Sequence, residues 1–276
     1  MAAEQLRELL AARPRDGRFR MADVDAASTP GLKRRSQLKT DLDVHQKHLF
    51  NLQERLYAEH KRALLIVLQA MDTGGKDGTV THVIGHMNPQ AVTVSSFKVP
   101  TAEEKRHGFL WRIRRGLPAE GYVGLFNRSH YEDVLVARVH NLAPADTIER
   151  RYEQINRFEY DLVRSRTTVV KFMLHISYEE QRNRLLDRLK NPDKHWKFSE
   201  HDIDERAYWD DYMSAYGIAL TRCSTTWAPW YVIPANDKLY RNWAVAGILL
   251  ETLQEMDPKY PHPPLDVPRL IKRLKA

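Results

Sequence analysis

The chain has 276 residues, of which 42% are hydrophobic and 29% are charged, a composition typical of a soluble globular protein of one or two domains. Its 43 basic and 36 acidic residues give a net charge of +7, which favours binding to polyanions such as nucleic acid or a chain of phosphates. The single cysteine, Cys223, excludes an internal disulfide and fits a reducing, cytoplasmic compartment. No apolar run approaches the roughly 20 residues of a membrane helix, so we expect no membrane partner.

Residues 1–60 are expected to form a helical N-terminal extension that is interrupted near "STPGLKRR". Within it, Leu42, Leu49 and Leu56 are spaced as on one face of a helix. At the other end, residues 257–276 are rich in proline and are expected to form a C-terminal tail that wraps the surface.

Between residues 61 and 256, predicted strands alternate with predicted helices about five times. Apolar runs predict strands near residues 62–71, 91–97, 121–129, 167–177 and 228–235. The predicted helices lie near residues 77–87, 101–117, 144–163, 177–189, 205–223 and 242–256. Such alternation favours right-handed βαβ units and therefore one α/β domain, with a parallel sheet covered on both faces.

The turn "MDTGGKDGT", after the first predicted strand, has the order of a phosphate-binding loop. Gly74 and Gly75 would let the backbone curl around an anion, and Lys76 would add a positive charge beside it. The usual pattern G-x-x-x-x-G-K-[ST] is only partly met, because Ala70 takes the place of the first glycine and Asp77 that of the hydroxyl. By itself the stretch is about equally compatible with a plain turn between a strand and a helix.

Two other stretches favour a phosphate site. "FNRSHYEDV" follows a predicted strand, at the sheet edge where α/β proteins bind ligands, and its carboxylates could hold Mg²⁺. "EEQRNRLLDRLKNPDKHWK" places Arg184 and Arg188 on one helix face, like the lid of a nucleoside-monophosphate kinase. A polar loop and a solvated helix face are the alternatives for these two stretches taken singly.

Together, several long words resemble the family 2 polyphosphate kinases over about residues 30–260. They are "MDTGGKDGT", "HMNPQAVTVSSFKVP", "FLWRIRRGLPAEGYVGLFNRSHYEDVLV", "NPDKHWKFS", "DERAYWDDY" and "APWYVIPANDK". The resemblance implies a three-layer P-loop kinase fold similar to thymidylate kinase, with a kinase domain at residues 61–256 and a helical lid at about residues 179–205. It also implies an enzyme that moves the terminal phosphoryl group between inorganic polyphosphate and adenine or guanine nucleotides, with Mg²⁺ or Mn²⁺, often as a homodimer or homotetramer.

The resemblance further assigns the site residues. The catalytic residues would be Asp72, Lys76, Arg128, Asp133 and Arg184, with Asp72 and Asp133 as metal ligands. Phosphate or nucleotide would be bound by Gly74, Gly75, Asp77, Gly78, Thr79, Asn127, Glu132, Arg188 and Lys190. As a separate hypothesis, Lys98 and Arg112 would also bind phosphate and, with Arg114 and Arg115, extend the basic groove.

Asp77, Asn127 and the pair Glu132-Asp133 are similar to the spelling of the class III members, which phosphorylate both AMP and ADP. The metal role of the aspartate that other classes have at position 127 cannot pass to Asn127, so Glu132 or Asp133 would take it over.

Two rival functions remain open from the sequence. An ATP-dependent nucleotide kinase would share the loop, the lid and the metal, and would differ only in its phosphoryl donor. A basic nucleic-acid-binding module is disfavoured, because the chain has no helix-turn-helix, zinc knuckle or ribonucleoprotein motif, and we expect no nucleic-acid partner.

Overall fold

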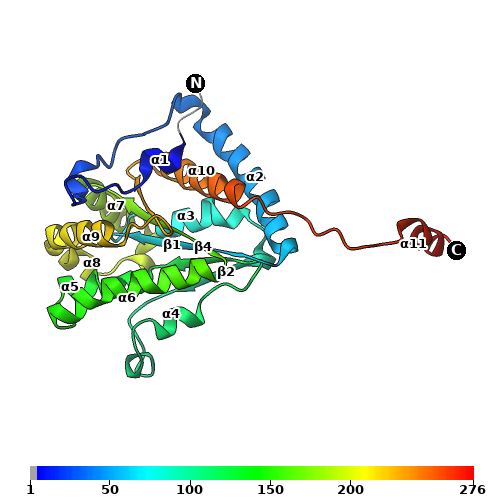
Figure 1. The fold of residues 1–276 in the computed structure, drawn as a ribbon. Helices are drawn as coiled ribbons and strands as arrows, with labels where there is room; N and C mark the ends of the chain where they lie inside the picture. Colours follow the sequence, from blue (N-terminus) through cyan, green and yellow to red (C-terminus); the bar gives the residue numbers. More distant parts are fainter. Residues whose placement is uncertain (1–4) are drawn as a thin grey trace.

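The computed structural model describes residues 5–276 and contains one parallel sheet of five strands (Figure 1). The strands are β1 (Ala63–Ala70), β2 (Val92–Ser96), β3 (Val123–Asn127), β4 (Thr167–His175) and β5 (Trp230–Pro234). Their order in the sheet is β2-β3-β1-β4-β5, and each neighbouring pair is parallel. The predicted α/β class and the five predicted strands are therefore confirmed.

Helices cover both faces of the sheet, which makes three layers. One face carries α1 (Leu6–Leu10), α2 (Leu38–Glu59), α3 (Lys76–His82) and α10 (Lys238–Met256). The other carries α4 (Trp111–Arg115), α5 (Val136–Val139), α6 (Ala145–Arg164) and α9 (Trp209–Cys223). Strand β1 is buried on both sides: Leu64 and Ile66 enter the first core, and Leu65 and Val67 enter the second.

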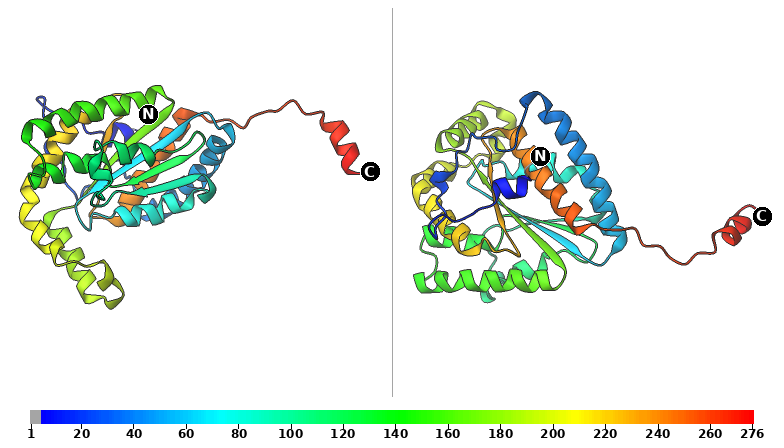
Figure 2. Two further views of the ribbon diagram at one scale, coloured as in Figure 1. Left: turned by 90° about the horizontal axis from the view of Figure 1, so that it is seen from below. Right: turned by 45° about the horizontal axis from the view of Figure 1, so that its top comes forward.

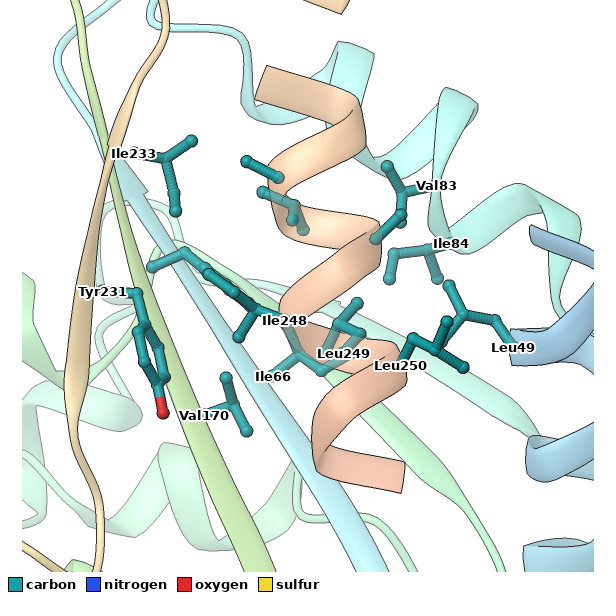
Figure 3. Close-up of a cluster of buried hydrophobic side chains, with 14 of the residues drawn as sticks. Leu49, Ile66, Val83, Ile84, Val170, Tyr231, Ile233, Ile248, Leu249 and Leu250 are labelled. Carbon is teal, nitrogen blue, oxygen red and sulfur yellow. The ribbon is translucent and has the colours of Figure 1, made fainter. Parts of the chain in front are cut away.

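The first core forms around α10. Figure 3 shows Ile248 and Leu249 of this helix between sheet residues such as Ile66 and, on the far side, Val83 and Ile84. Because α10 is buried along most of its length, its N-terminal turn is held firmly beside the loop that follows β1.

The second core contains a buried polar cluster. The ammonium group of Lys171 on β4 forms an ion pair with Glu159 on α6, and both side chains are fully buried. The Tyr131 hydroxyl accepts from Lys171 and donates to Glu159, both at 2.8 Å, and His130 lies 3.2 Å from the same carboxylate. Burial alone would raise the pKa of Glu159, but Lys171 and His130 offset this effect and leave the pKa below its usual value. The cluster ties the loop after β3 to the centre of the domain.

The N-terminal extension is less helical than expected. Helix α2 is confirmed, with Leu42, Leu49 and Leu56 buried, but residues 11–34 form only a short 3₁₀ turn and irregular chain. This segment runs along the edge of β5, where Ala12 N–H donates to the Trp230 carbonyl at 2.8 Å. Glycines with positive φ, such as Gly17 at 74°, turn the chain and prevent a continuous helix.

The helix predicted over residues 101–117 is also wrong in part. The structure has a 3₁₀ turn at Glu104–Arg106 and then α4, with a break around Gly108. Thr101 and Glu104 form a reciprocal capping box, with bonds of 3.2 and 2.7 Å, so a turn begins where the helix was predicted but does not continue.

The C-terminal tail does not wrap the body. It leaves α10 beside α2, where the Tyr260 hydroxyl donates to Glu54 at 2.9 Å, and then extends away to α11 (Val267–Leu274), as Figures 1 and 2 show. None of residues 261–276, all of which the structure describes, is buried. The prolines of this segment favour extended chain and donate no backbone hydrogen bond to the body. Within residues 5–276, no helix has the length and apolar character needed to cross a membrane.

Candidate functional site

An open cleft of about 1100 Å³ lies at the carboxyl edge of the sheet, over the loop that joins β1 to α3. Ten of the predicted site residues line it: Asp72, Gly74, Gly75, Lys76, Asp77, Gly78, Lys98, Arg128, Arg184 and Arg188. Six others, Thr79, Arg112, Asn127, Glu132, Asp133 and Lys190, do not. Most residues predicted for the loop after β1 therefore lie together in the cleft, whereas only some of the residues predicted farther along the chain line it.

The loop after β1 requires its glycines. Gly75 has φ of 104°, and a Cβ on Gly74 would lie 2.5 Å from the Ala70 Cβ and 2.8 Å from the Met71 carbonyl oxygen. Thr79 is buried and donates to the Gly75 carbonyl at 3.2 Å within α3, so its hydroxyl does not face the cleft. Asp77 occupies the exposed position where the usual motif has its hydroxyl.

Lys76 is a half-buried cation without an ion pair. Its ammonium group donates to the Ala70 carbonyl at 2.9 Å, and across the described residues no carboxylate lies within 4 Å of it. Burial, followed by the nearby Arg128, lowers the pKa of Lys76. A phosphate in the loop would supply the missing negative charge.

Arg128 reaches the same cleft from the end of β3. Its φ of 62° turns the chain sharply, and its guanidinium lies 3.3 Å from Asp72 and 3.8 Å from Glu132. Gln69 donates to Glu132 at 2.9 Å and so fixes that carboxylate behind the arginine. Asn127, the preceding residue, donates to Asp77 at 3.3 Å, which joins the end of β3 to the start of α3.

The predicted lid consists of α7 (Tyr178–Lys190), a 3₁₀ turn at Pro192–Lys197 and α8 (His201–Asp204), and it stands out from the body (Figure 2). Its Lys197 lies 3.7 Å from Asp77 on the loop side. Arg188 donates to the Lys197 carbonyl at 3.2 Å and pairs with Asp202 at 3.5 Å. The lid therefore contacts the phosphate-loop region through charged side chains.

Comparison with known proteins identifies the family of this chain. The family model described as "Polyphosphate kinase 2 (PPK2)" matches residues 32–261. The chain belongs to the polyphosphate kinase 2 family.

Similar proteins and a solved structure support this family assignment. The chain is 49% identical over 249 residues to an "AMP/ADP-polyphosphate phosphotransferase" of Meiothermus ruber, covering 90% of this chain and 93% of the relative. It is 43% identical to an "ADP-polyphosphate phosphotransferase" of Rhodopseudomonas palustris, with 80% of each chain covered. A crystal structure of polyphosphate kinase 2 from Arthrobacter aurescens TC1 has a TM-score of 0.95 at 47% identity, covering 99% of this chain and 98% of that chain.

Phosphotransferases of the polyphosphate kinase 2 family generally need a divalent metal, and the cleft offers one suitable position. Asp72 lines the cleft, as does Asp202, whose pKa is raised by burial and by the negative charge of Asp72. One or two carboxylates together with substrate phosphates are the usual ligands of Mg²⁺, so Asp72 fits a cation that arrives with its phosphate. The described residues contain no preformed group of three His, Cys, Asp or Glu side chains that could hold a metal alone.

Asp133, the other predicted metal ligand, faces away from this position. Its carboxylate lies 3.7 Å from Arg151 on α6, and Arg151 also donates to its backbone carbonyl at 2.8 Å. Burial raises the pKa of Asp133, and Arg151 opposes this change. A metal role for Asp133 remains a prediction that would require its side chain to turn.

Arg112 and its neighbours do not extend the cleft. Arg112 is buried and donates to the Lys98 carbonyl at 2.7 Å, and Arg114 and Arg115 lie over the rings of Phe158 and Trp111. The cause is that α4 belongs to the second face of the sheet, whereas the cleft opens toward α2 and α10 on the first. The basic side chains that continue the cleft are Lys39, Lys238 and Arg241.

Arg184 lies against the phosphate loop and not on the outer surface of the predicted lid. Its guanidinium donates to the Thr73 carbonyl at 3.0 Å and to the Ala235 and Asn236 carbonyls at 2.6 and 3.0 Å, and it pairs with Glu180 at 2.7 Å. These bonds hold the phosphate loop against α7 and the end of β5.

Arg184→Ala is expected to lower kcat/KM roughly 10²-fold and also to lower the melting temperature, because the buried Ala235 carbonyl and two partly buried carbonyls lose their donor. Steady-state kinetics and thermal unfolding measure the two effects. Arg188→Ala is the comparison, since its half-exposed ion pair should contribute little to stability. An Arg184→Ala protein with unchanged kcat/KM would contradict a role at this site.

Arg241 is one of the cleft residues that the sequence did not reveal, together with Lys39, Lys238 and Asp202. It lies in the first turn of α10, and a Cβ added to Gly75 would approach its guanidinium to 2.0 Å. The only signal was a lone arginine directly before the apolar helix predicted from residue 242.

Proposed function

We propose that the protein transfers the terminal phosphoryl group of inorganic polyphosphate to AMP and to ADP. The observation that carries this proposal is Lys76, a half-buried cation that lines an open cleft and forms no ion pair with the described residues. The cleft continues past the loop with further basic side chains, which suits a chain of phosphates better than a single nucleotide.

The acceptor range rests on three observations. The name of the Meiothermus ruber relative includes both AMP and ADP. Asp77 and Asn127, two residues that resemble the class III spelling, are hydrogen-bonded to each other at 3.3 Å. The spelling of the members that use only ADP has glycine at the position of Asp77 and aspartate at the position of Asn127, and this chain has neither. The family resemblance implies adenine nucleotides as acceptors, with guanine nucleotides as the further candidates.

The transfer needs alignment and neutralisation of charge more than covalent help. An oxygen of the nucleotide's terminal phosphate bonds to the end phosphorus of the chain. The bond from that phosphorus to its bridging oxygen then breaks, and the electron pair stays on a chain one phosphate shorter. Lys76 and Arg128 stabilise the phosphoryl oxygens, and no general base is required because the acceptor is already anionic.

The metal in this proposal is Mg²⁺ or Mn²⁺, which supplies further neutralisation of the phosphate charge when it is bound. Asp72 would hold it, and Arg128, 3.3 Å away, keeps that carboxylate oriented toward the cleft. We also infer a homodimer or homotetramer in the cytoplasm, in keeping with the family resemblance.

Incubation of the purified protein with long-chain polyphosphate, Mg²⁺ and either AMP or ADP tests the acceptor range, with the nucleotides separated by chromatography. We expect ADP and then ATP from AMP, and ATP from ADP. Product from ADP alone would leave the family unchanged and overturn the assignment to both acceptors.

A further inference from the structure

Arg241 is almost completely buried, with 2% of its surface exposed, yet it borders the cleft. Positions for a Cβ on Gly75 and on Gly78 lie 2.0 and 2.8 Å from its two terminal nitrogens. A side chain at either position would displace the guanidinium, which lies directly against the phosphate loop and the start of α3.

No acidic side chain neutralises Arg241 in the part of the chain that the structure describes. Its Nε and Nη2 atoms donate to the side-chain oxygen of Asn242 at 3.1 and 2.8 Å, and no hydrogen bond is made by Nη1. By contrast, Arg128 and Arg184 both have carboxylate partners. A buried cation without a counter-charge is unfavourable unless a bound anion completes it.

The electrostatic surroundings agree with this geometry. Burial, followed by repulsion from Arg184, lowers the pKa of Arg241 to about 10, and Asp237 opposes this change. An anion close to Nη1 would stabilise the charged form.

The position of Arg241 in the cleft indicates which anion. Arg128 approaches the phosphate loop from β3, whereas Arg241 approaches it from α10, beside Lys238 and toward Lys39 of α2. A ligand with phosphates in a row would meet Lys76 at the loop and then Arg241 on the α10 side. A nucleoside triphosphate has a sugar after its third phosphate and could use fewer of these charges.

We propose that Arg241 forms a second phosphate subsite, which holds a phosphate of the polyphosphate chain that is not transferred. This inference rests on the proposed function, because it assigns a position to the rest of the donor chain. Its consequence is a preference for donors longer than the segment bound by the phosphate loop itself.

Arg241→Met and Arg241→Lys test the subsite, and Arg7→Met is the matched control. Arg7 is also partly buried, but it pairs with Glu255 and lies outside the cleft. Calorimetry with tripolyphosphate and no nucleotide measures the dissociation constant, and thermal unfolding without ligand measures stability. Kinetics with chains of increasing length separate KM from kcat.

We expect Arg241→Met to weaken tripolyphosphate binding about tenfold or more, the equivalent of one charge-assisted hydrogen bond. Its melting temperature without ligand should equal or exceed that of the wild type, whereas Arg7→Met should melt lower and bind normally. In Arg241→Met, KM for long chains should rise by a larger factor than kcat falls. The KM of Arg241→Lys should lie between those of the wild type and Arg241→Met.

Wild-type binding and KM in both Arg241 variants would overturn the subsite while phosphoryl transfer by the wild type still supported the proposed function. If Arg241→Met does not fold, the same comparison is made with Arg241→Lys, which keeps the charge. A wild type that binds tripolyphosphate through Arg241 but transfers nothing would support the subsite and contradict the proposed function. Equal loss of affinity for tripolyphosphate and for inorganic phosphate would contradict a subsite specific to the rest of the chain.

Discussion

Lys76→Ala is expected to lower kcat/KM for polyphosphate roughly 10²- to 10³-fold while the protein remains folded. Lys76 lies half-buried at the start of α3 and forms no ion pair with a carboxylate among the described residues, so its role is directed at a ligand. The fold should tolerate its loss, because no ion pair is broken and only the Ala70 carbonyl loses a donor.

Initial rates with ADP and long-chain polyphosphate measure the effect, and thermal unfolding confirms that the variant is native. Lys272→Ala is the control, because Lys272 lies on α11, exposed and away from the body. Near-normal turnover by a folded Lys76→Ala protein would exclude the loop as the transfer site.

Glu159→Gln is expected to reduce the free energy of unfolding by about 3–5 kcal/mol, because it leaves the ammonium group of Lys171 buried without its counter-charge. Urea unfolding followed by fluorescence measures the change. The double variant Glu159→Gln/Lys171→Met should recover part of the loss, since both charges are then absent. A loss below about 1 kcal/mol in Glu159→Gln would contradict the ion pair.

The same residue gives a pH dependence with a defined sign. The pKa of Glu159 is lowered in the folded protein, so its contribution to stability is complete above the unfolded pKa and disappears as the pH falls toward the folded one. Acid should therefore destabilise the wild type more than Glu159→Gln. Activity should also fall in the variant, because Tyr131 and His130 connect this cluster to the loop that carries Arg128.

The sheet and the phosphate loop could be predicted because their signals are local. The run from Ala63 to Ala70 is apolar on both sides, which only a central strand explains, and Gly74 and Gly75 precede Lys76 at the spacing that the turn requires. The starts of the helices predicted near residues 101 and 177 are local signals too, because the Thr101 and Ser177 side chains each accept from a backbone N–H three residues later.

The direction of individual side chains could not be predicted, because it depends on partners far along the chain. Asp133 turns to Arg151, and Arg184 donates to carbonyls more than 50 residues away rather than to the open lid surface. Arg112 lies on the face of the sheet opposite the cleft, and the sequence does not show on which face α4 packs. The position of Arg241 depends on how α10 packs beside the loop.

The choice of phosphoryl donor tests the central claim most directly. The purified protein is incubated with AMP and Mg²⁺, and with either long-chain polyphosphate or ATP as the donor, and the nucleotides are separated by chromatography. Our account predicts that polyphosphate converts AMP to ADP and ATP, and that ATP is a much poorer donor. Formation of ADP from ATP and AMP, with no product from polyphosphate, would contradict it and indicate an ATP-dependent nucleotide kinase on the same fold.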